Sequence, residues 1–261
     1  MTDQSTRAAD APQFSIGKVL GTSFAVIGRN IVPFLLLAIM ISIPSIVIRR
    51  MVGVDPQVYQ AQINQQQTLY FASLSSLGSW ISMFVSIVTS SLVTAALVYG
   101  TFQDLRGQRA AIGDLVGRGF SSLVPVVLAA IAYSLLLIVG TIMLLVPGVI
   151  LATALWVYVP AIVLEKAGVA TSFRRSRTLT KGHRWAILGL YLIVLAVVLA
   201  VEFVLTLVLH VSLAALAYHW AAIPIQLLYL VFIAVMSAVG YYHLRAEKEG
   251  ISVSEIATVF D

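Results

Sequence analysis

Five polar side chains in the last third of the chain have types and spacings that suit proton or ion chemistry. Glu202, Thr206 and His210 are four residues apart and form one stripe on a helix. His219 and Gln226 are seven residues apart and share a face of the next apolar helix. If the chain turns near residues 211–218, the two faces meet as an intramembrane polar cluster. Such a cluster relays protons, binds a cation or holds two helices together.

A structural explanation of the same five residues stays open. A buried Glu is often protonated and hydrogen-bonded to a neighbouring helix, and His beside aromatic residues suits the aromatic belt of a membrane surface. If Pro224 begins the last span, residues 210–223 lie outside the membrane and the pairing fails. Zinc is chemically allowed at Glu202, His210 and His219. The short ligand spacing of zinc sites is missing, so no metal is expected.

A second candidate is the basic stretch TSFRRSRTLTKGHRW, residues 171–185, which holds five Lys and Arg and no acid. As a helix it places Arg174, Arg177 and Lys181 on one face, beside a more apolar face. This pattern favours a helix lying in the membrane interface. Its cations either anchor the topology or bind anionic lipid headgroups or a partner. The candidate lipid- or partner-binding residues are Lys18, Arg29, Arg118, Arg174, Arg175, Arg177, Lys181 and Arg184.

Glu165 is expected to dock this basic helix onto the rest of the protein by pairing with Arg174 or Arg175. Docking and lipid contact are compatible roles for the helix. A tight turn is expected at residues 146–148, between two apolar runs. The expected structural residues are Pro147, Gly148, Pro160 and Glu165.

A stripe of hydroxyl residues, spaced by three and four, is expected to let helices pack closely. A hydrophilic lining for a substrate path is the alternative. The stripe consists of Ser75, Ser79, Ser82, Ser86, Ser90 and Thr94.

No enzyme motif is present in the sequence. The chain has no cysteine and no G-x-G-x-x-G, Walker, H-E-x-x-H or G-x-S-x-G sequence. Asp104 and Asp114 lie in a mixed-charge loop of the kind usually found at a solvated surface. We therefore expect no catalytic residue and no cofactor.

The composition places these residues in a membrane protein. The chain is 60% hydrophobic and 10% charged, with a mean hydropathy of +0.98, whereas a soluble domain carries about 25% charged residues. The net charge is +5 and the pI about 9.6. Because the basic residues lie beside apolar runs, anionic lipid headgroups explain the charge better than nucleic acid does.

Six apolar runs are long enough to cross a bilayer, which takes about 20 residues each. They predict an all-α integral membrane protein with six transmembrane helices arranged as three hairpins. The membrane domain covers residues 14–245, between a disordered tail (1–13) and a C-terminal tail (246–261). The runs are Asn30–Ile48, Leu77–Tyr99, Ser121–Leu145, Val149–Leu164, Trp185–Leu209 and Ala222–Leu244.

Lys and Arg are distributed unevenly around these runs. Of the 16 Lys and Arg, only Arg49 and Arg50 flank one set of span ends, and all the others flank the opposite set. Cytoplasmic loops carry the excess of Lys and Arg, so both termini are expected in the cytoplasm, with the spans in a bacterial inner membrane. The first 13 residues lack the apolar segment of a signal peptide.

The chain also repeats itself. Ile16–Phe24 is similar to Ile112–Phe120, and the basic stretch occupies the corresponding place before the fifth run. We expect three units, about 14–100, 110–165 and 168–245, each a cytoplasmic interfacial amphipathic helix followed by a two-span hairpin. Parallel repeats occur in transporters, but duplication also produces them without transport.

The stretch VPGVILATALWVYVPAIVLEKAGVATSFRRSRTLTKGHRWAILG resembles the YciC-like bacterial inner-membrane proteins, which are similar to the membrane domain of some glycerophosphodiester phosphodiesterases. The resemblance implies a six-span fold. This chain has no soluble phosphodiesterase domain, so that activity is not carried over. The residues that carry the resemblance are Pro147, Gly148, Pro160, Glu165, Gly168, Ser176, Leu179, Gly182 and Trp185.

These observations favour a non-enzymatic accessory or organising protein whose basic helices contact anionic lipids or a membrane-protein partner. A small transporter or channel for a lipid, ion or small solute is the alternative, and it rests on the repeat, the hydroxyl stripe and Glu202. A membrane-embedded lipid-modifying enzyme has the least support, because no acid pair or His–acid motif gathers near the cytoplasmic interface.

Overall fold

The computed structural model describes residues 14–51, 77–109, 111–210 and 215–250. Regular structure in these ranges is entirely helical. The helices are α2 (Ile16–Met51), α5 (Leu77–Leu105), α6 (Ile112–Ser121), α7 (Leu123–Met143), α8 (Leu145–Ala154), α9 (Tyr158–Glu165), α10 (Val169–Thr180), α11 (Arg184–His210) and α12 (Ala215–Glu249).

Six helical stretches are long and apolar enough to cross a membrane, as the sequence predicted. The fourth stretch joins α8 and α9, and the others each lie within one helix. The all-α class and the six candidate spans are therefore confirmed. The stretches are Ile16–Ile48, Trp80–Leu105, Leu123–Ile142, Leu145–Glu165, Arg184–Val204 and Ile223–Glu249.

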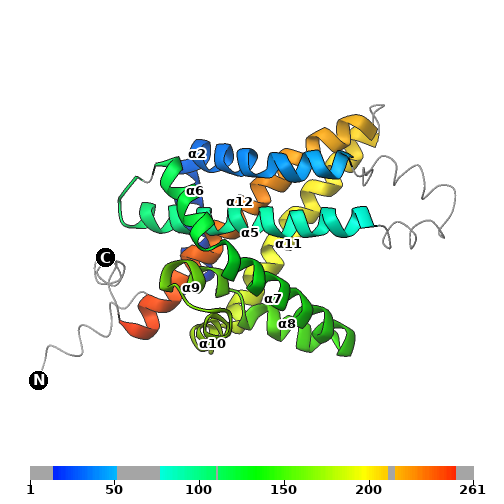
Figure 1. Cartoon of the computed structure of the whole chain (residues 1–261). Helices are drawn as coiled ribbons and strands as arrows, with labels where there is room; N and C mark the ends of the chain where they lie inside the picture. Colours follow the sequence, from blue (N-terminus) through cyan, green and yellow to red (C-terminus); the bar gives the residue numbers. More distant parts are fainter. Residues whose placement is uncertain (1–13, 52–76, 110, 211–214, 251–261) are drawn as a thin grey trace, which may run out of the picture.

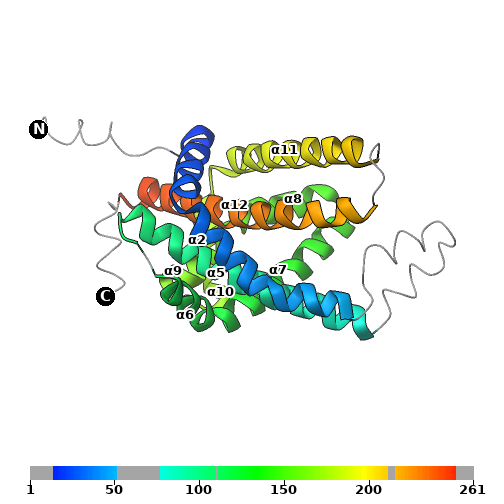
Figure 2. The ribbon, with the colours of Figure 1, turned by 90° about the horizontal axis from the view of Figure 1, so that it is seen from above.

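The long helices diverge from one end of the molecule (Figure 1). α2 packs against both α5 and α12, α7 packs against α8, and α12 also contacts α5 and α11. Figure 2 shows α11 and α12 side by side, with their far ends well away from the far ends of α2 and α5. The short helices α6 and α10, the start of α2 and the last turns of α12 gather at the left of Figure 1. We call this end the base.

Helix α5 lies among several others and contacts α2, α6, α7, α9 and α12. Its buried face includes Ala95 and Ala96, whose small side chains let neighbouring helices approach closely. The hydroxyls of Ser86 and Ser90 donate to backbone carbonyls of α5 itself, those of Ser82 and Ile87, at 2.7 and 3.1 Å. These bonds favour the packing explanation of the hydroxyl stripe; the side chains of Ser75 and Ser79 lie outside the described ones.

Helix α2 bends at Asn30, the residue at which the sequence placed the start of the first span. Asn30 has non-helical backbone angles (φ −122°, ψ 19°). Its side-chain amide donates to the carbonyl of Val26 at 3.0 Å and to Oδ1 of Asp104 at 2.7 Å. The same carboxylate pairs with Arg29, whose Nη2 lies 2.5 Å from Oδ2. Asp104 is thus a structural partner of the bend, where the sequence suggested a solvated surface charge.

The predicted turn at residues 146–148 was wrong by a few residues. The chain reverses at Leu144, which is extended (φ −172°, ψ 145°), and Pro147 and Gly148 lie inside the first turns of α8. Proline is tolerated there because the first turn of a helix leaves its N–H groups unbonded. Gly148 serves close packing instead: a Cβ on it would lie 2.7 Å from Oγ1 of Thr141 on α7.

Two other predicted helix limits differ from the structure. The fourth apolar run is not one helix, since α8 ends at Ala154 and α9 begins at Tyr158. Pro160 is buried in the first turn of α9, where it needs no backbone donor. Helix α12 continues beyond the predicted end of the sixth span to Glu249. Its extra turn carries several of the contacts that hold the base together.

Candidate functional site

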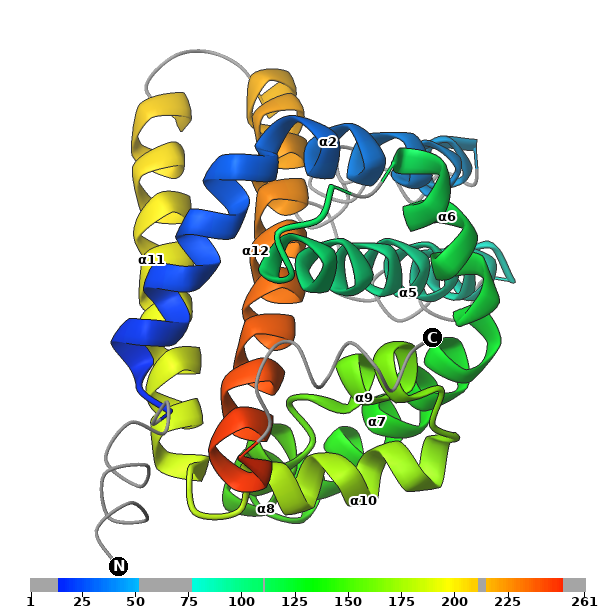
Figure 3. The ribbon, with the colours of Figure 1, turned by 90° about the vertical axis from the view of Figure 1, so that its left-hand side faces the viewer.

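Helix α10, the basic stretch of the sequence, lies across the base beside the end of α12 (Figure 3). One face of α10 is buried and carries Ser172, Ser176, Leu179 and Thr180. The opposite face carries the exposed side chains of Arg174 and Arg177. This helix is therefore divided between a hydroxyl face toward the protein and a cationic face away from it.

The hydroxyl face of α10 satisfies the backbone groups freed by the break between α8 and α9. Ser176 Oγ donates to the carbonyl of Ala154 at 2.9 Å and accepts from the N–H of Val157 at 3.2 Å. Thr180 Oγ1 lies 3.1 Å from the same carbonyl of Ala154. Ser237 of α12 donates to the carbonyl of Trp156 at 3.1 Å. Since unpaired buried backbone groups are costly, these hydroxyls make the break possible.

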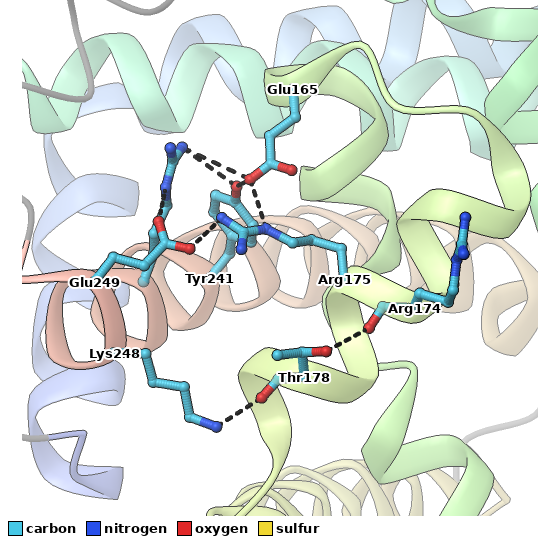
Figure 4. Close-up of polar contacts among 8 residues, drawn as sticks. Glu165, Arg174, Arg175, Thr178, Tyr241, Lys248 and Glu249 are labelled. Atoms are coloured by element: carbon cyan, nitrogen blue, oxygen red, sulfur yellow. Dashed lines mark hydrogen bonds and ion pairs between the residues drawn. The ribbon is translucent and has the colours of Figure 1, made fainter.

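A network of charged residues joins α9, α10 and α12 (Figure 4). Glu165 Oε1 accepts from Arg175 Nε at 2.9 Å and from the hydroxyl of Tyr241, and Arg245 Nη1 lies 3.8 Å from it. Glu249 pairs with Arg175, and also with Arg245 Nε at 2.7 Å. We call these five residues the clamp. Two cations meet two carboxylates, so its charges balance.

Burial alone would lower the pKa of Arg175, but the carboxylates of Glu165 and Glu249 and the neighbouring Tyr241 outweigh it and raise that pKa. Arg175 therefore stays charged at any physiological pH. The sequence left Arg174 and Arg175 open as partners of Glu165, and the structure selects Arg175. Figure 4 shows Arg175 directed toward both carboxylates and Arg174 directed away from them.

The last turn of α12 ties two more segments to the base. Lys248 Nζ donates to the carbonyls of Thr178 and Lys181, at 2.6 and 2.7 Å, where a cation suits the negative end of the α10 dipole. Glu247 accepts from the N–H of Phe14 at 2.6 Å and lies 3.1 Å from Nε2 of His183. Sequence reasoning had assigned both residues to a tail.

The signal that could have found this turn is the i, i+4 spacing of Arg245 and Glu249. Gly240 gives no such signal in the sequence. In the structure a Cβ there would lie 2.2 Å from the ring of Trp156, so the glycine lets α12 pack against the break before α9. The spacing of Arg245 and Glu249 alone indicates that the helix continues beyond Leu244.

The eight predicted basic residues fall into distinct groups in the structure. Arg29 and Arg175 pair with carboxylates inside the protein. Arg184 is half-buried, and its Nε meets no hydrogen-bond partner within the described residues. Arg118 lies with its guanidinium 5.6 Å from the ring centroid of Tyr99. The remaining four cations, Lys18, Arg174, Arg177 and Lys181, are exposed.

A pocket of about 270 Å³ opens between the α6–α7 junction and the end of α9. Its lining includes two basic residues, Arg118 and Lys166, and the hydroxyl residues Ser121 and Ser122. Pro125 and Ile162 complete the lining. We call this the basic pocket. Sequence reasoning selected Arg118 but missed Lys166, whose left-handed backbone (φ 52°, ψ 31°) has no signature in the sequence.

The predicted intramembrane cluster is described only in part. Helix α11 ends at His210 and α12 begins at Ala215, so Pro224 lies inside α12 and does not begin it. Glu202 is half-buried and Gln226 is exposed. The side chains of Thr206, His210 and His219 lie outside the described ones. The meeting of the two faces stays a prediction.

Metal ligands are not gathered in the described part of the chain, which holds no group of three or more His, Cys, Asp or Glu side chains suited to a metal ion. The clamp uses its two carboxylates for ion pairs with arginine, which leaves them poorly suited to a cation.

Residues 110–246, which run from the start of α6 into the last turns of α12, match a family described as a domain of unknown function, DUF7847. The match covers just over half of the chain. The protein belongs to the DUF7847 family. No curated protein and no solved structure matches the chain. All six residues of the basic pocket lie within the DUF7847 match.

Proposed function

We propose that this DUF7847 protein is a non-enzymatic accessory or organising protein of the bacterial inner membrane, whose base binds anionic lipid headgroups. The observation that carries the proposal is the outward set of cations formed by Lys18, Arg174, Arg177 and Lys181, which are exposed. Each cation near an anionic membrane surface contributes about 1 kcal/mol of attraction. A protein partner with an acidic surface is the competing occupant.

Exposed aromatic side chains at the base support contact with lipid. Phe24 is 62% exposed, Phe120 is 58% exposed and Trp185, directly after the basic stretch, is 85% exposed. Aromatic residues of this kind favour the headgroup level of a bilayer. Phe24 and Phe120 also occupy equivalent positions in the sequence repeat. Their shared exposure supports the proposal that α6 and the start of α2 are interfacial helices that precede two-span hairpins.

The proposed topology places the base in the cytoplasm, together with both chain ends. The distribution of Lys and Arg supports it, because the ends of the spans at the base carry nearly all of these residues. A reporter fused after Glu249 and a reporter inserted in residues 52–76 test it. Cytoplasmic activity of the first alone is expected, and the reverse result would refute the topology.

The lipid proposal is tested with a variant that changes Arg174, Arg177 and Lys181 to Gln. Arg175 is left intact, because removing it would break the clamp and confuse binding with folding. Native mass spectrometry of the protein in mild detergent, with added phosphatidylglycerol, is expected to show fewer retained lipids for this variant.

The matched control changes Arg49 and Arg50 to Gln, the two basic residues expected at the opposite membrane face. It is expected to retain lipid like the wild type. Unchanged retention by the triple variant would overturn the lipid proposal. A membrane protein that co-purifies in stoichiometric amount with wild type and is lost from the triple variant would instead favour the partner alternative.

A further inference from the structure

We infer that the basic pocket is a binding site for a phosphate group, held by Arg118 and Lys166. The inference deepens the proposed function and rests on it where the phosphate belongs to a lipid headgroup. A free phosphate or small phosphorylated molecule presents the same chemistry. A phosphate needs positive charge and several hydrogen-bond donors in one place, and the pocket supplies both.

The residues that the structure describes do not balance the charge of the pocket. Its lining contains Arg118 and Lys166 but no carboxylate. Glu165, the residue before Lys166, is committed to Arg175 and Tyr241 of the clamp. An anion from outside the protein would therefore neutralise charge that the described residues leave uncompensated.

Arg118 is held in place with donor capacity to spare. Its guanidinium lies over the ring of Tyr99, a cation–π arrangement that fixes its plane. Its Nε is buried and meets no hydrogen-bond acceptor in the described part of the chain. The side chain of Arg118 makes no hydrogen bond or ion pair within the described residues, so its terminal Nη groups are available to an acceptor in the pocket such as a phosphate oxygen.

The hydroxyl residues complete the donor set. Ser122 is only 8% exposed and lies at the start of α7, yet its side chain makes no capping hydrogen bond there. Ser121 Oγ donates to the carbonyl of Arg118 at 2.9 Å, which helps hold the α6–α7 junction. Within the described residues the Ser122 hydroxyl makes no hydrogen bond, so it can donate to a ligand in the pocket that it lines with Arg118 and Lys166.

The size and place of the pocket suit a headgroup. A pocket of about 270 Å³ accommodates a phosphate with a small substituent. The exposed Phe120 and Val124, on the elements that meet at the junction, are 58% and 67% exposed. A lipid with its phosphate in the pocket would have its acyl chains next to these apolar side chains.

The test compares Arg118→Gln and Lys166→Asn with Arg109→Gln, which removes one exposed positive charge from the loop between α5 and α6, outside the pocket. Asn is chosen at position 166 because it tolerates a left-handed backbone. One arm measures retention of phosphatidic acid by native mass spectrometry. A second arm measures thermal stabilisation of detergent-solubilised protein by inorganic phosphate at constant ionic strength.

Each pocket variant is expected to weaken binding about tenfold, the loss of one charge-assisted hydrogen bond. Arg109→Gln is expected to change it less than about twofold. If only the pocket variants lose retention of phosphatidic acid, and inorganic phosphate does not stabilise the wild type, the ligand is a lipid headgroup. Selective loss of the response to inorganic phosphate assigns a free phosphate.

Equal losses of binding in all three variants would overturn the inference that the pocket is a specific site. General attraction between the base and lipid would then explain the binding. Unchanged binding in Arg118→Gln and Lys166→Asn would overturn the pocket alone, because the triple variant of α10 tests the proposed function separately. Loss of inorganic phosphate binding in the pocket variants, with lipid retention unchanged in every variant, would keep the site and refute the lipid proposal.

Discussion

The clamp and the basic pocket meet at adjacent residues, Glu165 and Lys166, yet they handle charge in opposite ways. In the clamp, two arginines meet two carboxylates and a tyrosine hydroxyl inside the protein. In the basic pocket, Arg118 and Lys166 have no carboxylate in the lining. At the end of α9, Glu165 belongs to the clamp and Lys166 lines the basic pocket.

The difference teaches how to separate structural from functional cations. A cation whose partner lies within the same chain stabilises the fold, because each group compensates the desolvation of the other. A fixed cation whose compensation is missing costs stability and is a candidate for binding. Four variants test this contrast, in order of their expected effect on stability.

The largest effect is expected for Glu165→Gln in the clamp. Gln leaves Arg175 and the 8%-exposed Arg245 to share a single carboxylate, that of Glu249. Breaking a buried ion pair costs about 3 to 5 kcal/mol, and we expect about 3 kcal/mol because Glu165 is partly exposed. Unfolding in mixed micelles with increasing SDS measures this free energy.

The double variant Glu165→Gln with Arg175→Gln is the control for the clamp. If the two residues stabilise each other, the loss in the double variant is smaller than the sum of the losses in the single variants. If the loss in the double variant equals the sum of the two single losses, Glu165 and Arg175 do not stabilise each other. The contrast between the clamp and the basic pocket would then be refuted.

The second-largest loss of stability is expected for Ser176→Ala, which removes the hydroxyl at the α8–α9 break. The N–H of Val157 loses its acceptor and the carbonyl of Ala154 loses one of its donors. A buried backbone group left unpaired costs about 1 to 3 kcal/mol, so about 2 kcal/mol is expected from the same unfolding measurement.

Thr178→Ala is the matched control, since Thr178 is an exposed residue of the same helix whose hydroxyl donates to the carbonyl of Arg174 on α10, and the substitution leaves its backbone carbonyl available to Lys248. It should change stability by less than about 0.5 kcal/mol. Equal losses in the two variants would mean that the serine acts through helix propensity and not through the break.

The third effect is expected for Asp104→Asn at the bend of α2. Asn keeps an acceptor for the amide of Asn30 but loses the ion pair with Arg29, whose side chain is 56% exposed. Exposed ion pairs contribute about 0.2 to 1 kcal/mol, so about 0.5 kcal/mol is expected. The loss should disappear at 1 M salt, where exposed charges are screened; a salt-independent loss would contradict this.

The sequence predicts the helices well and the polar contacts less well, for physical reasons. The spans follow from a local property, the length of each apolar run. The bend follows from another, because Asn30 is a polar residue between a basic segment and an apolar one. The break at residues 155–157 does not follow from a local property, because that run is apolar throughout. The hydroxyls that pair with backbone groups at the break, those of Ser176, Thr180 and Ser237, are distant in sequence.

The candidate site was likewise only half predictable. Basic residues near spans are visible in the sequence, and so is the choice of Glu165 as the acid that docks α10. Which cation is paired depends on the direction of each side chain: Arg175 and Arg174 are adjacent, yet one is in the clamp and the other is exposed. Lys166 was missed because nothing local marks its proximity to Arg118.

The smallest effect on stability is expected for Arg118→Gln, and this is the sharpest test of the contrast. Removing a cation that has no carboxylate partner should change the free energy of unfolding by less than about 0.5 kcal/mol in phosphate-free buffer. With ligand present, a binding-competent protein gains RT ln(1 + [L]/Kd), about 2.7 kcal/mol at a hundredfold excess over Kd. The wild type should show that gain, and Arg118→Gln, with a Kd about tenfold higher, should lose about half of it. If Arg118→Gln instead destabilises the unliganded protein as strongly as Glu165→Gln does, Arg118 is a second structural cation, and the orphaned Nε reflects packing over Tyr99 with no ligand involved.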